Sequence, residues 1–478
     1  MSTARTVAKN TTALLAAEVI SKAAGVVYFA VLARYIKVEG VGKISTAQAL
    51  VYILIVIVSL GFDQLLTRDI AAVKTRAASY GTNVAFIKLG LSLIYLALLY
   101  PVTHLLGYSP EVVLLVYLYA ANALLGSFTE IAASIFRAFE KMEYIVVIRL
   151  CRDATNIVLS LLAIYLRFSL AAIVGISVFA SFCQILLAGW LLRRQFHLRP
   201  ARIGFGICRK LLLACLPFAV VALYPLAQTR LNILVLSATG NNVDVGRFAA
   251  ASMVIATLML LPSVFVQATF PVFARFSAHS SESLRLAYQK SFAYLLLLGI
   301  AVSVGVFLTA DRILPLLLGD SFVTAASVLK VLAWLPAVGF VGYCNGNFLC
   351  ATGRERLFMY TEGGFTVFYA VLAVSLTSRF GYMGASYAML IPTVVGFGFY
   401  TVLCHNLTGL KLPWKLMAAA VLAALVMAVF VQTSLQAGVN LLVVVVLIAP
   451  AIYGASLYLL RAITREDVAL FKQALRLA

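Results

Sequence analysis

The chain has 478 residues, of which 63% are hydrophobic and only 11% are charged, and its formal net charge is +20. A soluble globular protein is about half apolar and one quarter charged, so this composition excludes a soluble domain and predicts an all-α polytopic membrane protein. Because most Lys and Arg residues lie in short segments between apolar runs, we attribute the charge to membrane topology and to contact with anionic membrane lipids, and we expect no nucleic-acid partner.

Apolar runs of about 20 residues predict about 14 transmembrane helices, because this length crosses the hydrocarbon core of a bilayer. The connectors are short, so there is no room for an extramembrane catalytic domain, and we predict that the chain is not an enzyme. The first run contains charges and lacks a clear cleavage site, so we expect it to stay attached as a transmembrane helix. The predicted spans are 11–33, 45–62, 82–101, 111–134, 145–166, 169–192, 210–236, 246–270, 291–310, 325–350, 357–377, 382–404, 414–433 and 437–460.

The first span contains Glu18 and Lys22, one helical turn apart. A charge near the centre of a bilayer costs about 2.5–3.5 kcal/mol, and pairing on one helix face reduces that cost. We therefore predict that this face borders a wet cavity and that Glu18 holds Lys22 in place. Lys88, in the third span, lies close to a cytoplasmic end, and we expect it to snorkel to the surface.

Positive connectors predict the orientation of the chain. Lys and Arg gather in alternate connectors, including the run 193–210, so we predict that both termini are cytoplasmic. The first outside connector departs from the rule, because it holds Arg34, Lys37 and Lys43. Either chance placed these cations together, or they line the mouth of a pathway for an anion.

A weak internal repeat predicts the domain organisation. Val41-Gly42-Lys43 opens the second span and resembles Val245-Gly246-Arg247, which opens the eighth. Each copy follows the first helix of a six-helix block, as in transporters built from two parallel halves. We therefore predict an N-terminal six-helix lobe (1–200), a C-terminal six-helix lobe (201–410), and two additional transmembrane helices with a cytoplasmic tail (411–478).

Charged residues also begin the fifth span, where Arg149, Arg152 and Asp153 lie together. They form either a salt-bridge cluster at the membrane interface or part of a cavity. Arg230 lies near the outer end of the seventh span, between Gln228 and Asn232. It either snorkels or forms the counterpart of Arg34 in the second half.

The seventh span contains Pro217 and Pro225, which predict a kinked or locally opened helix with freed carbonyl groups. In the tenth span, Asn345 is flanked by small residues that permit close helix packing. Its role is therefore either helix packing or substrate contact. The four histidines are far apart, the cysteines form no Cys-x-x-Cys pair, and there is no Walker loop. We therefore expect no metal and no cofactor.

Several motifs in this order resemble the Wzx-like polysaccharide or O-antigen repeat-unit flippases of the multidrug/oligosaccharidyl-lipid/polysaccharide (MOP) exporter superfamily. The resemblance covers roughly residues 10 to 405. The motifs are Arg34…Gly40-x-Gly42, Gly61-Phe62…Thr67-Arg68-Asp69-Ile70, Phe136-Arg137-Ala138-Phe139-Glu140-Lys141-Met142, Val245-Gly246-Arg247-Phe248, Phe270-Pro271-Val272-Phe273 and Gly381-Tyr382-x-Gly384-Ala385. Such proteins often carry an acid after an Arg in helix 7, whereas this chain has Arg230-Leu231-Asn232. It therefore lacks an acid on which ion coupling at that position would depend.

This resemblance implies two six-helix lobes around a central cavity. It also implies movement of an undecaprenyl-diphosphate-linked oligosaccharide from the cytoplasmic to the outer leaflet of a prokaryotic inner membrane, with polysaccharide polymerase and glycosyltransferases as further partners. We expect alternating access by rocking of one lobe against the other. Fixed cations in such a cavity replace the water lost by the diphosphate, and Arg offers a planar fork suited to phosphate.

We therefore predict a cationic cavity. The residues expected to contact the substrate are Lys22, Arg34, Arg230, Arg149 and Arg152, and the supporting polar residues are Glu18, Gln228, Asn232 and Asn345. Three other functions remain open: a flippase for the peptidoglycan precursor (lipid II), which also needs a cationic cavity; a MATE-like multidrug exporter, which would need an acidic one; and a glycan polymerase or ligase, which usually needs a large outside loop.

Overall fold

The computed structural model describes residues 3–196, 201–409 and 413–462, and their side chains except those of 3–23, 216–223, 225 and 446. These residues form helices and no strand, which confirms the all-α prediction. The chain divides into two compact units, which we call unit 1 (Met1–Gly246) and unit 2 (Arg247–Ala478) and describe separately. The unit boundary falls inside a helix, and the lobe boundary near residue 200 stays a prediction.

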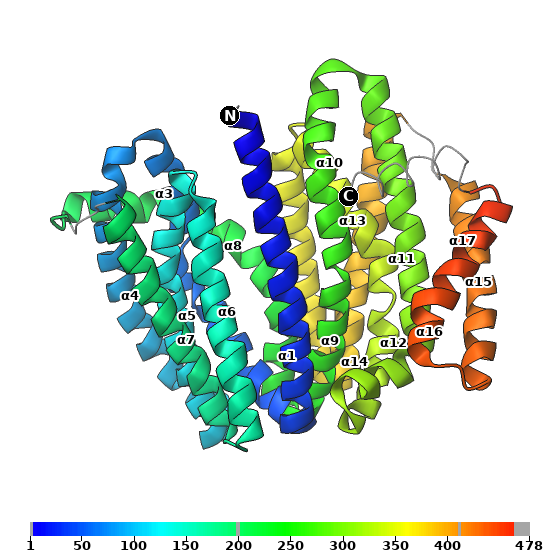
Figure 1. The fold of residues 1–478 in the computed structure, drawn as a ribbon, viewed down its shortest axis with the longest axis horizontal. Helices are drawn as coiled ribbons and strands as arrows, with labels where there is room; N and C mark the ends of the chain where they lie inside the picture. Colours follow the sequence, from blue (N-terminus) through cyan, green and yellow to red (C-terminus); the bar gives the residue numbers. More distant parts are fainter. Residues whose placement is uncertain (1–2, 197–200, 410–412, 463–478) are drawn as a thin grey trace. The chain divides into compact units, whose positions relative to one another are not determined.

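Unit 1 consists of long helices that pack side by side (Figure 1). Its elements are α1 (Thr3–Leu54), α2 (Val56–Ser59), α3 (Phe62–Ala72), η1 (Lys74–Arg76), α4 (Ala77–Leu105), α5 (Pro110–Ala138), α6 (Met142–Tyr165), α7 (Leu170–Phe196), α8 (Phe205–Thr239) and the start of α9 (Asn242–Leu258). Its core is made of apolar side chains from α1, α3, α4 and α5, among them Leu50, Phe62, Tyr95 and Leu115.

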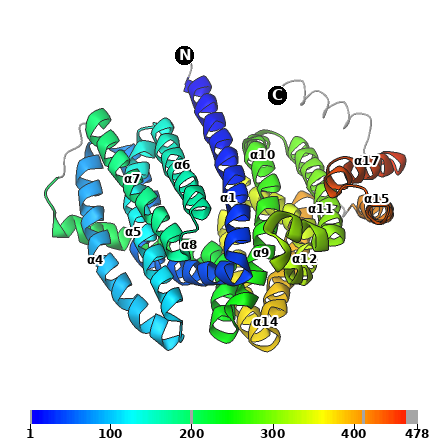
Figure 2. The same ribbon diagram turned by 60° about the horizontal axis from the view of Figure 1, so that its bottom comes forward.

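The chain changes direction twice in the first helices of unit 1, each time at one or two residues and without a loop. α1 is two helices joined at Lys37, whose backbone has φ 60° and ψ −176°, and Figure 2 shows the change of direction. The predicted connector 34–43 is therefore mostly helical. α2 and α3 are separated by Leu60 and Gly61, which both have positive φ (41° and 75°). Gly61 adopts this left-handed conformation without the steric cost that a Cβ imposes.

The glycines of the two copies of the repeated motif lie at close helix contacts within unit 1. A Cβ on Gly42 would collide with the backbone carbonyl of Asn242, and a Cβ on Gly246 would collide with that of Val38. Each glycine therefore permits the close approach of the second part of α1 and the start of α9. The repeated glycines therefore occupy corresponding positions in the sequence, and each also permits a close contact between two helices.

Unit 2 is also built of long helices. Its elements after α9 are α10 (Leu260–His279), α11 (Ser281–Leu318), η2 (Asp320–Ala325), α12 (Ala326–Leu332), α13 (Leu335–Ala351), α14 (Glu355–Thr408), α15 (Trp414–Gln436), α16 (Leu441–Val443), the π-turn η3 (Val444–Ile448) and α17 (Ala449–Leu459). α10, α11, α13 and α14 enclose an aromatic core that includes Phe273, Tyr288, Phe340 and Phe348. α15 packs on α11, and α17 packs on α15 (Figure 2).

The helices have the length and composition of membrane spans. In the described part of the chain, eight pass as spans, or nine if the bent pair Asp320–Leu332 and Leu335–Ala351 counts as one. Two of the eight bend at a one-residue turn: Glu355–Thr408 contains the predicted spans 357–377 and 382–404, and Ala24–Ala72 contains the end of the first predicted span and all of the second. The arrangement is consistent with the predicted set, and the chain is a multi-pass membrane protein.

Candidate functional site

Arg230 is the predicted cation with the clearest environment. Its guanidinium carbon lies 5.2 Å from the ring centroid of Tyr52, which belongs to the second part of α1. Both residues are half-buried. A guanidinium held over an aromatic face by a cation–π contact keeps N–H groups available for a phosphate to accept from. The aromatic ring thus orients the cation without neutralising its charge.

The neighbours of Arg230 on α8 point elsewhere. Asn232 is buried, whereas Gln228 is half-buried, and residues two apart on a helix do not share a face. α8 is held near its end by Tyr108, in the turn between α4 and α5, whose hydroxyl lies 2.7 Å from that of Ser237. Burial raises the pKa of the Tyr108 phenol, so it stays protonated and able to form this bond. Gln228 and Asn232 are four residues apart and share a face of α8, so the helix separates both of them from Arg230.

The first outside connector contains three cations in three different environments. Lys43 forms ion pairs with Glu39 (2.9 Å) and with Glu111 of α5 (2.7 Å), so its charge is compensated within unit 1. Arg34 is exposed at the end of the first part of α1. Lys37 is exposed as well, and no partner of its side chain is found in the part of the chain that the structure describes. Of the three, only Arg34 was predicted from the sequence as a binding residue.

The backbone of Lys37 carries strain. At φ 60° and ψ −176° it lies in a region that is almost reserved for glycine, and such outliers cost about 1–3 kcal/mol. A cation at a helix C-terminus gains about 0.3–1 kcal/mol from the helix dipole, which is less than that cost. The turn is held from one side by Tyr35, whose hydroxyl donates to the carbonyl of Phe168 at 2.8 Å.

Arg149 and Arg152 lie on α6. Arg149 is exposed, and Arg152 places its Nε 3.4 Å from a carboxylate oxygen of its neighbour Asp153 while its side chain stays 43% exposed. Such an open pair contributes little to stability. Both residues remain candidates for substrate contact. The side chains of Glu18 and Lys22 lie outside the described residues.

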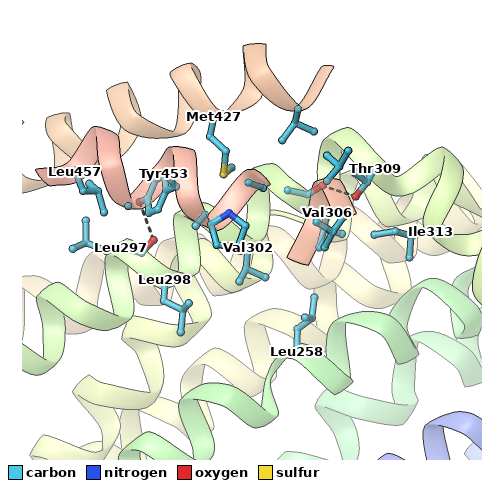
Figure 3. Close-up of a pocket in the computed structure, with 18 of the residues that line it drawn as sticks. Leu258, Leu297, Leu298, Val302, Val306, Thr309, Ile313, Met427, Tyr453 and Leu457 are labelled. Atoms are coloured by element: carbon cyan, nitrogen blue, oxygen red, sulfur yellow. Dashed lines mark hydrogen bonds between the residues drawn. The ribbon is translucent and has the colours of Figure 1, made fainter. Parts of the chain in front are cut away.

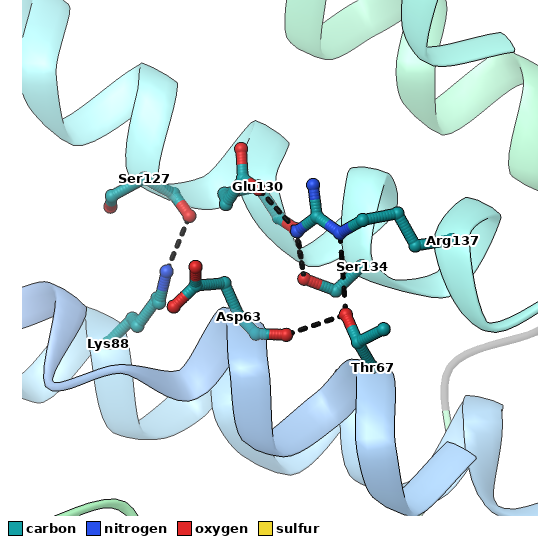
Figure 4. Close-up of polar contacts among 7 residues, drawn as sticks. All are labelled: Asp63, Thr67, Lys88, Ser127, Glu130, Ser134 and Arg137. Carbon is teal, nitrogen blue, oxygen red and sulfur yellow. Dashed lines mark hydrogen bonds and ion pairs between the residues drawn. The ribbon is translucent and has the colours of Figure 1, made fainter. Parts of the chain in front are cut away.

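A charged network that was not predicted from the sequence lies inside unit 1 (Figure 4). Lys88 on α4 is only 2% exposed, and its ammonium donates to the carbonyl of Ser127 on α5 at 2.6 Å. The prediction that Lys88 snorkels is therefore wrong. The carboxylates of Asp63 on α3 and Glu130 on α5 lie near it, and Arg137 pairs with Glu130.

This network is balanced, with two cations and two carboxylates (Figure 4). Arg137 also contacts Ser134 and Thr67, at 3.0 and 3.4 Å. A buried charge is tolerated when it is paired and hydrogen-bonded, so the network explains how unit 1 holds Lys88 inside the membrane. It has no net charge to offer to an anionic substrate. Its members come from three helices, and only the fold brings them together.

The polar residue predicted in unit 2 is satisfied within the core. Asn345 on α13 is fully buried, its carbonyl oxygen accepts from the Tyr288 hydroxyl at 2.9 Å, and its amide donates to Thr401 at 3.2 Å. These bonds join α11, α13 and α14. They favour packing over substrate contact, and a substrate role for Asn345 stays a prediction.

Unit 2 contains an apolar cavity of about 850 Å³ (Figure 3). α11 provides one wall, with Leu297, Val302 and Gly305, and the two appended helical segments provide the other, with Met427 of α15 and Tyr453 of α17. None of the lining residues is charged. The hydroxyl of Tyr453 donates a hydrogen bond to the carbonyl of Leu297 at 2.9 Å. Because this polar group is satisfied within the protein, the cavity wall stays apolar.

The cavity was not predicted, because the hydropathy of the last two spans matches that of ordinary lipid-facing helices. What makes it a cavity is how α15 and α17 pack on α11. Its lining suits an acyl or isoprenoid chain, because apolar surface of this kind gains free energy from covering another apolar surface. In the described residues, no group of three or more His, Cys, Asp or Glu side chains could hold a metal ion.

Comparison with known proteins places these features in a family. The family described as "Polysaccharide biosynthesis protein" matches residues 7–277. A putative O-antigen transporter of Shigella dysenteriae is 22% identical over 378 residues, covering 76% of this chain and 91% of that protein. The teichuronic acid biosynthesis protein TuaB of Bacillus subtilis is 22% identical over 171 residues, 33% of this chain and 35% of TuaB.

Solved structures share the fold. An inward closed conformation of the lipid II flippase MurJ superposes with a TM-score of 0.73 and 14% identity, covering 95% of this chain and 98% of that one. An inward-facing MATE transporter of the MOP superfamily gives 0.62 and 19%, covering 81% of this chain and 96% of that one. The expected family resemblance is confirmed: the chain belongs to the polysaccharide biosynthesis protein family and has the fold of the MOP superfamily.

Proposed function

We propose that this protein is a flippase that moves an undecaprenyl-diphosphate-linked oligosaccharide from the cytoplasmic to the outer leaflet of a prokaryotic inner membrane. The observation that carries the proposal is the apolar cavity of unit 2 in a chain that belongs to the polysaccharide biosynthesis protein family. The substrate has a long isoprenoid tail and an anionic head. A cavity without charge suits the tail, and the arginines of unit 1 suit the head.

The roles follow from this chemistry. Arg230, oriented by Tyr52, and Arg34 are proposed to contact the diphosphate, with Lys22, Arg149 and Arg152 as further cations. The cavity lined by Leu297, Met427 and Tyr453 is proposed to hold part of the tail. Alternating access would then move the head across the membrane while the tail stays in an apolar surrounding. Both termini are proposed to be cytoplasmic, and the enzymes that build and polymerise the glycan are proposed as partners.

Lipid analysis tests this proposal. Cells lacking the gene are extracted, and their polyprenyl lipids are measured by mass spectrometry. We expect undecaprenyl-diphosphate oligosaccharide to accumulate and to return to normal when the parent gene is restored. An unchanged lipid pool together with new sensitivity to cationic drugs would contradict the proposal and support an exporter instead.

Substitution of the arginines tests the cationic site. Arg34→Ala and Arg230→Ala should each restore less transport than the parent while reaching the membrane in equal amounts. A hydrogen bond to a charged group contributes about 1.5–3 kcal/mol, so a loss of about tenfold or more is expected. Transport equal to the parent in both variants would exclude the cationic site.

A flippase for the peptidoglycan precursor is the second candidate. This candidate is supported by the MurJ structure, which covers 95% of this chain, whereas the MATE structure covers 81%. At this coverage, at least part of α15–α17 has a counterpart in MurJ. The same lipid extract separates the two candidates, because a peptidoglycan precursor carries a peptide and a repeat-unit oligosaccharide does not. The mass of the accumulated lipid therefore decides between them.

A further inference from the structure

The turn at Lys37 has a counterpart in unit 2. α14 is also two helices joined at a single residue, Gly381, with φ 57° and ψ −137°. Three residues later both turns have a glycine, and a Cβ there would collide with the Ile36 side chain at Gly40 and with the Leu376 carbonyl at Gly384. The two turns thus share a backbone design. They differ at the turning residue, which is glycine in unit 2 and lysine in unit 1.

Glycine relieves the conformation at such a turn, because it has no Cβ. Lysine does not relieve the strain, and the free energy of that strain is larger than the stabilisation that a cation gains from the helix dipole at a helix C-terminus. A structural role for the side chain would therefore require a partner within the protein. In the described residues Lys37 has none, and its side chain is exposed.

Lys43 shows what a structural lysine in this segment looks like. It lies six residues further along the chain, in ordinary helical backbone, between the carboxylates of Glu39 and Glu111. Lys37 has the opposite properties, namely a strained backbone and an uncompensated charge in the part of unit 1 that the structure describes. Strained residues of this kind cluster at ligand-binding and switch positions.

We propose that Lys37 is a substrate-binding residue that contacts the diphosphate of the lipid-linked glycan at the outer end of its path. An ammonium is a point donor for phosphate oxygens and reaches them from a flexible stem. Arg34 is exposed three residues earlier, close enough to Lys37 for both cations to meet one diphosphate. This inference rests on the proposed function and adds a residue to it.

The test is a substitution that should change stability and transport in opposite directions. Lys37→Gly removes the strain and the cation together, Lys37→Arg keeps the cation, and Lys43→Gln is the matched control at a compensated lysine. Each variant is expressed at equal level in the deletion strain, and accumulated lipid-linked glycan is measured by mass spectrometry. Purified variants are unfolded by heat in detergent with and without undecaprenyl diphosphate, and undecaprenol serves as the uncharged probe.

For Lys37→Gly we expect an unfolding midpoint about 1–3 °C above the parent and transport about tenfold lower. Undecaprenyl diphosphate should stabilise this variant less than the parent, undecaprenol should stabilise both alike, and Lys37→Arg should behave like the parent. Lys43→Gln should lower the midpoint and leave transport per molecule unchanged.

Two results would overturn the inference: transport by Lys37→Gly equal to the parent, or a loss in Lys37→Arg as large as in Lys37→Gly. Failure of the proposed function has a different signature. In that case the deletion strain itself accumulates no lipid-linked glycan, whatever residue stands at position 37.

Discussion

The interiors of the two units handle polar groups differently. Unit 1 buries the ammonium of Lys88, which forms a balanced set with the half-buried Asp63, Glu130 and Arg137, and the set is drawn from three helices (Figure 4). In the core of unit 2, Asn345 is hydrogen-bonded to two neutral hydroxyl groups, and unit 2 also contains the apolar cavity. Helical units of similar construction can therefore have different interiors: unit 1 contains a network of charged side chains, and unit 2 contains an uncharged apolar cavity.

The largest expected effect comes from breaking the charge balance in unit 1. Lys88→Met should destabilise the protein by about 3 kcal/mol, because it removes a buried, hydrogen-bonded ammonium and leaves the half-buried carboxylates of Asp63 and Glu130 without it. The double variant Lys88→Met/Asp63→Asn should regain much of this loss. Thermal unfolding in detergent measures both, and a single variant as stable as the parent would show that charge balance does not hold the network together.

A smaller effect is expected in the core of unit 2. Asn345→Leu should cost about 1–3 kcal/mol, because the buried Tyr288 hydroxyl loses its acceptor. Asn347→Leu is the control, since its amide makes one bond, to the carbonyl of Val266 at 3.2 Å. A cost at Asn345 equal to that at Lys88 would remove the contrast between the two interiors.

Filling the cavity should impair transport while the protein stays folded. A Cβ at Gly305 meets no atom within 4 Å, so Gly305→Phe projects into the cavity without a backbone clash. We expect transport to fall by about tenfold, equivalent to about 1.4 kcal/mol. Gly398→Phe on α14 is the control, because it is also open around its Cβ and lies away from the cavity. Equal transport by the two variants, measured by glycan-lipid accumulation, would show that the tail does not use this space.

The smallest effect concerns the orientation of Arg230. Tyr52→Leu removes the aromatic face under the guanidinium, an interaction of about 0.5–1 kcal/mol, so transport should fall about two- to fivefold. Tyr52→Phe keeps the face and should transport like the parent. If Tyr52→Phe is as impaired as Tyr52→Leu, the hydroxyl of Tyr52 matters rather than its ring.

The repeat at Gly42 and Gly246 shows how far sequence reasoning reached. It marked two segments as equivalent, and the structure finds the same two glycines at a close contact of two helices. The contact itself was not predicted, because a glycine in a sequence does not say which backbone approaches it. Lys88 shows a failure of the same kind. Its distance from the helix end suggested snorkelling, yet the side chain turns to Ser127, 39 residues away.

The sequence by itself determined that the chain is helical, crosses a membrane many times and resembles polysaccharide-repeat-unit flippases, because hydropathy and local motifs are properties of contiguous residues. Only the tertiary structure decided which cations are compensated, since the partners of Lys43 and Lys88 lie on other helices. It also decided where an apolar cavity forms, since a cavity depends on how α11, α15 and α17 pack and not on the hydropathy of any one of them.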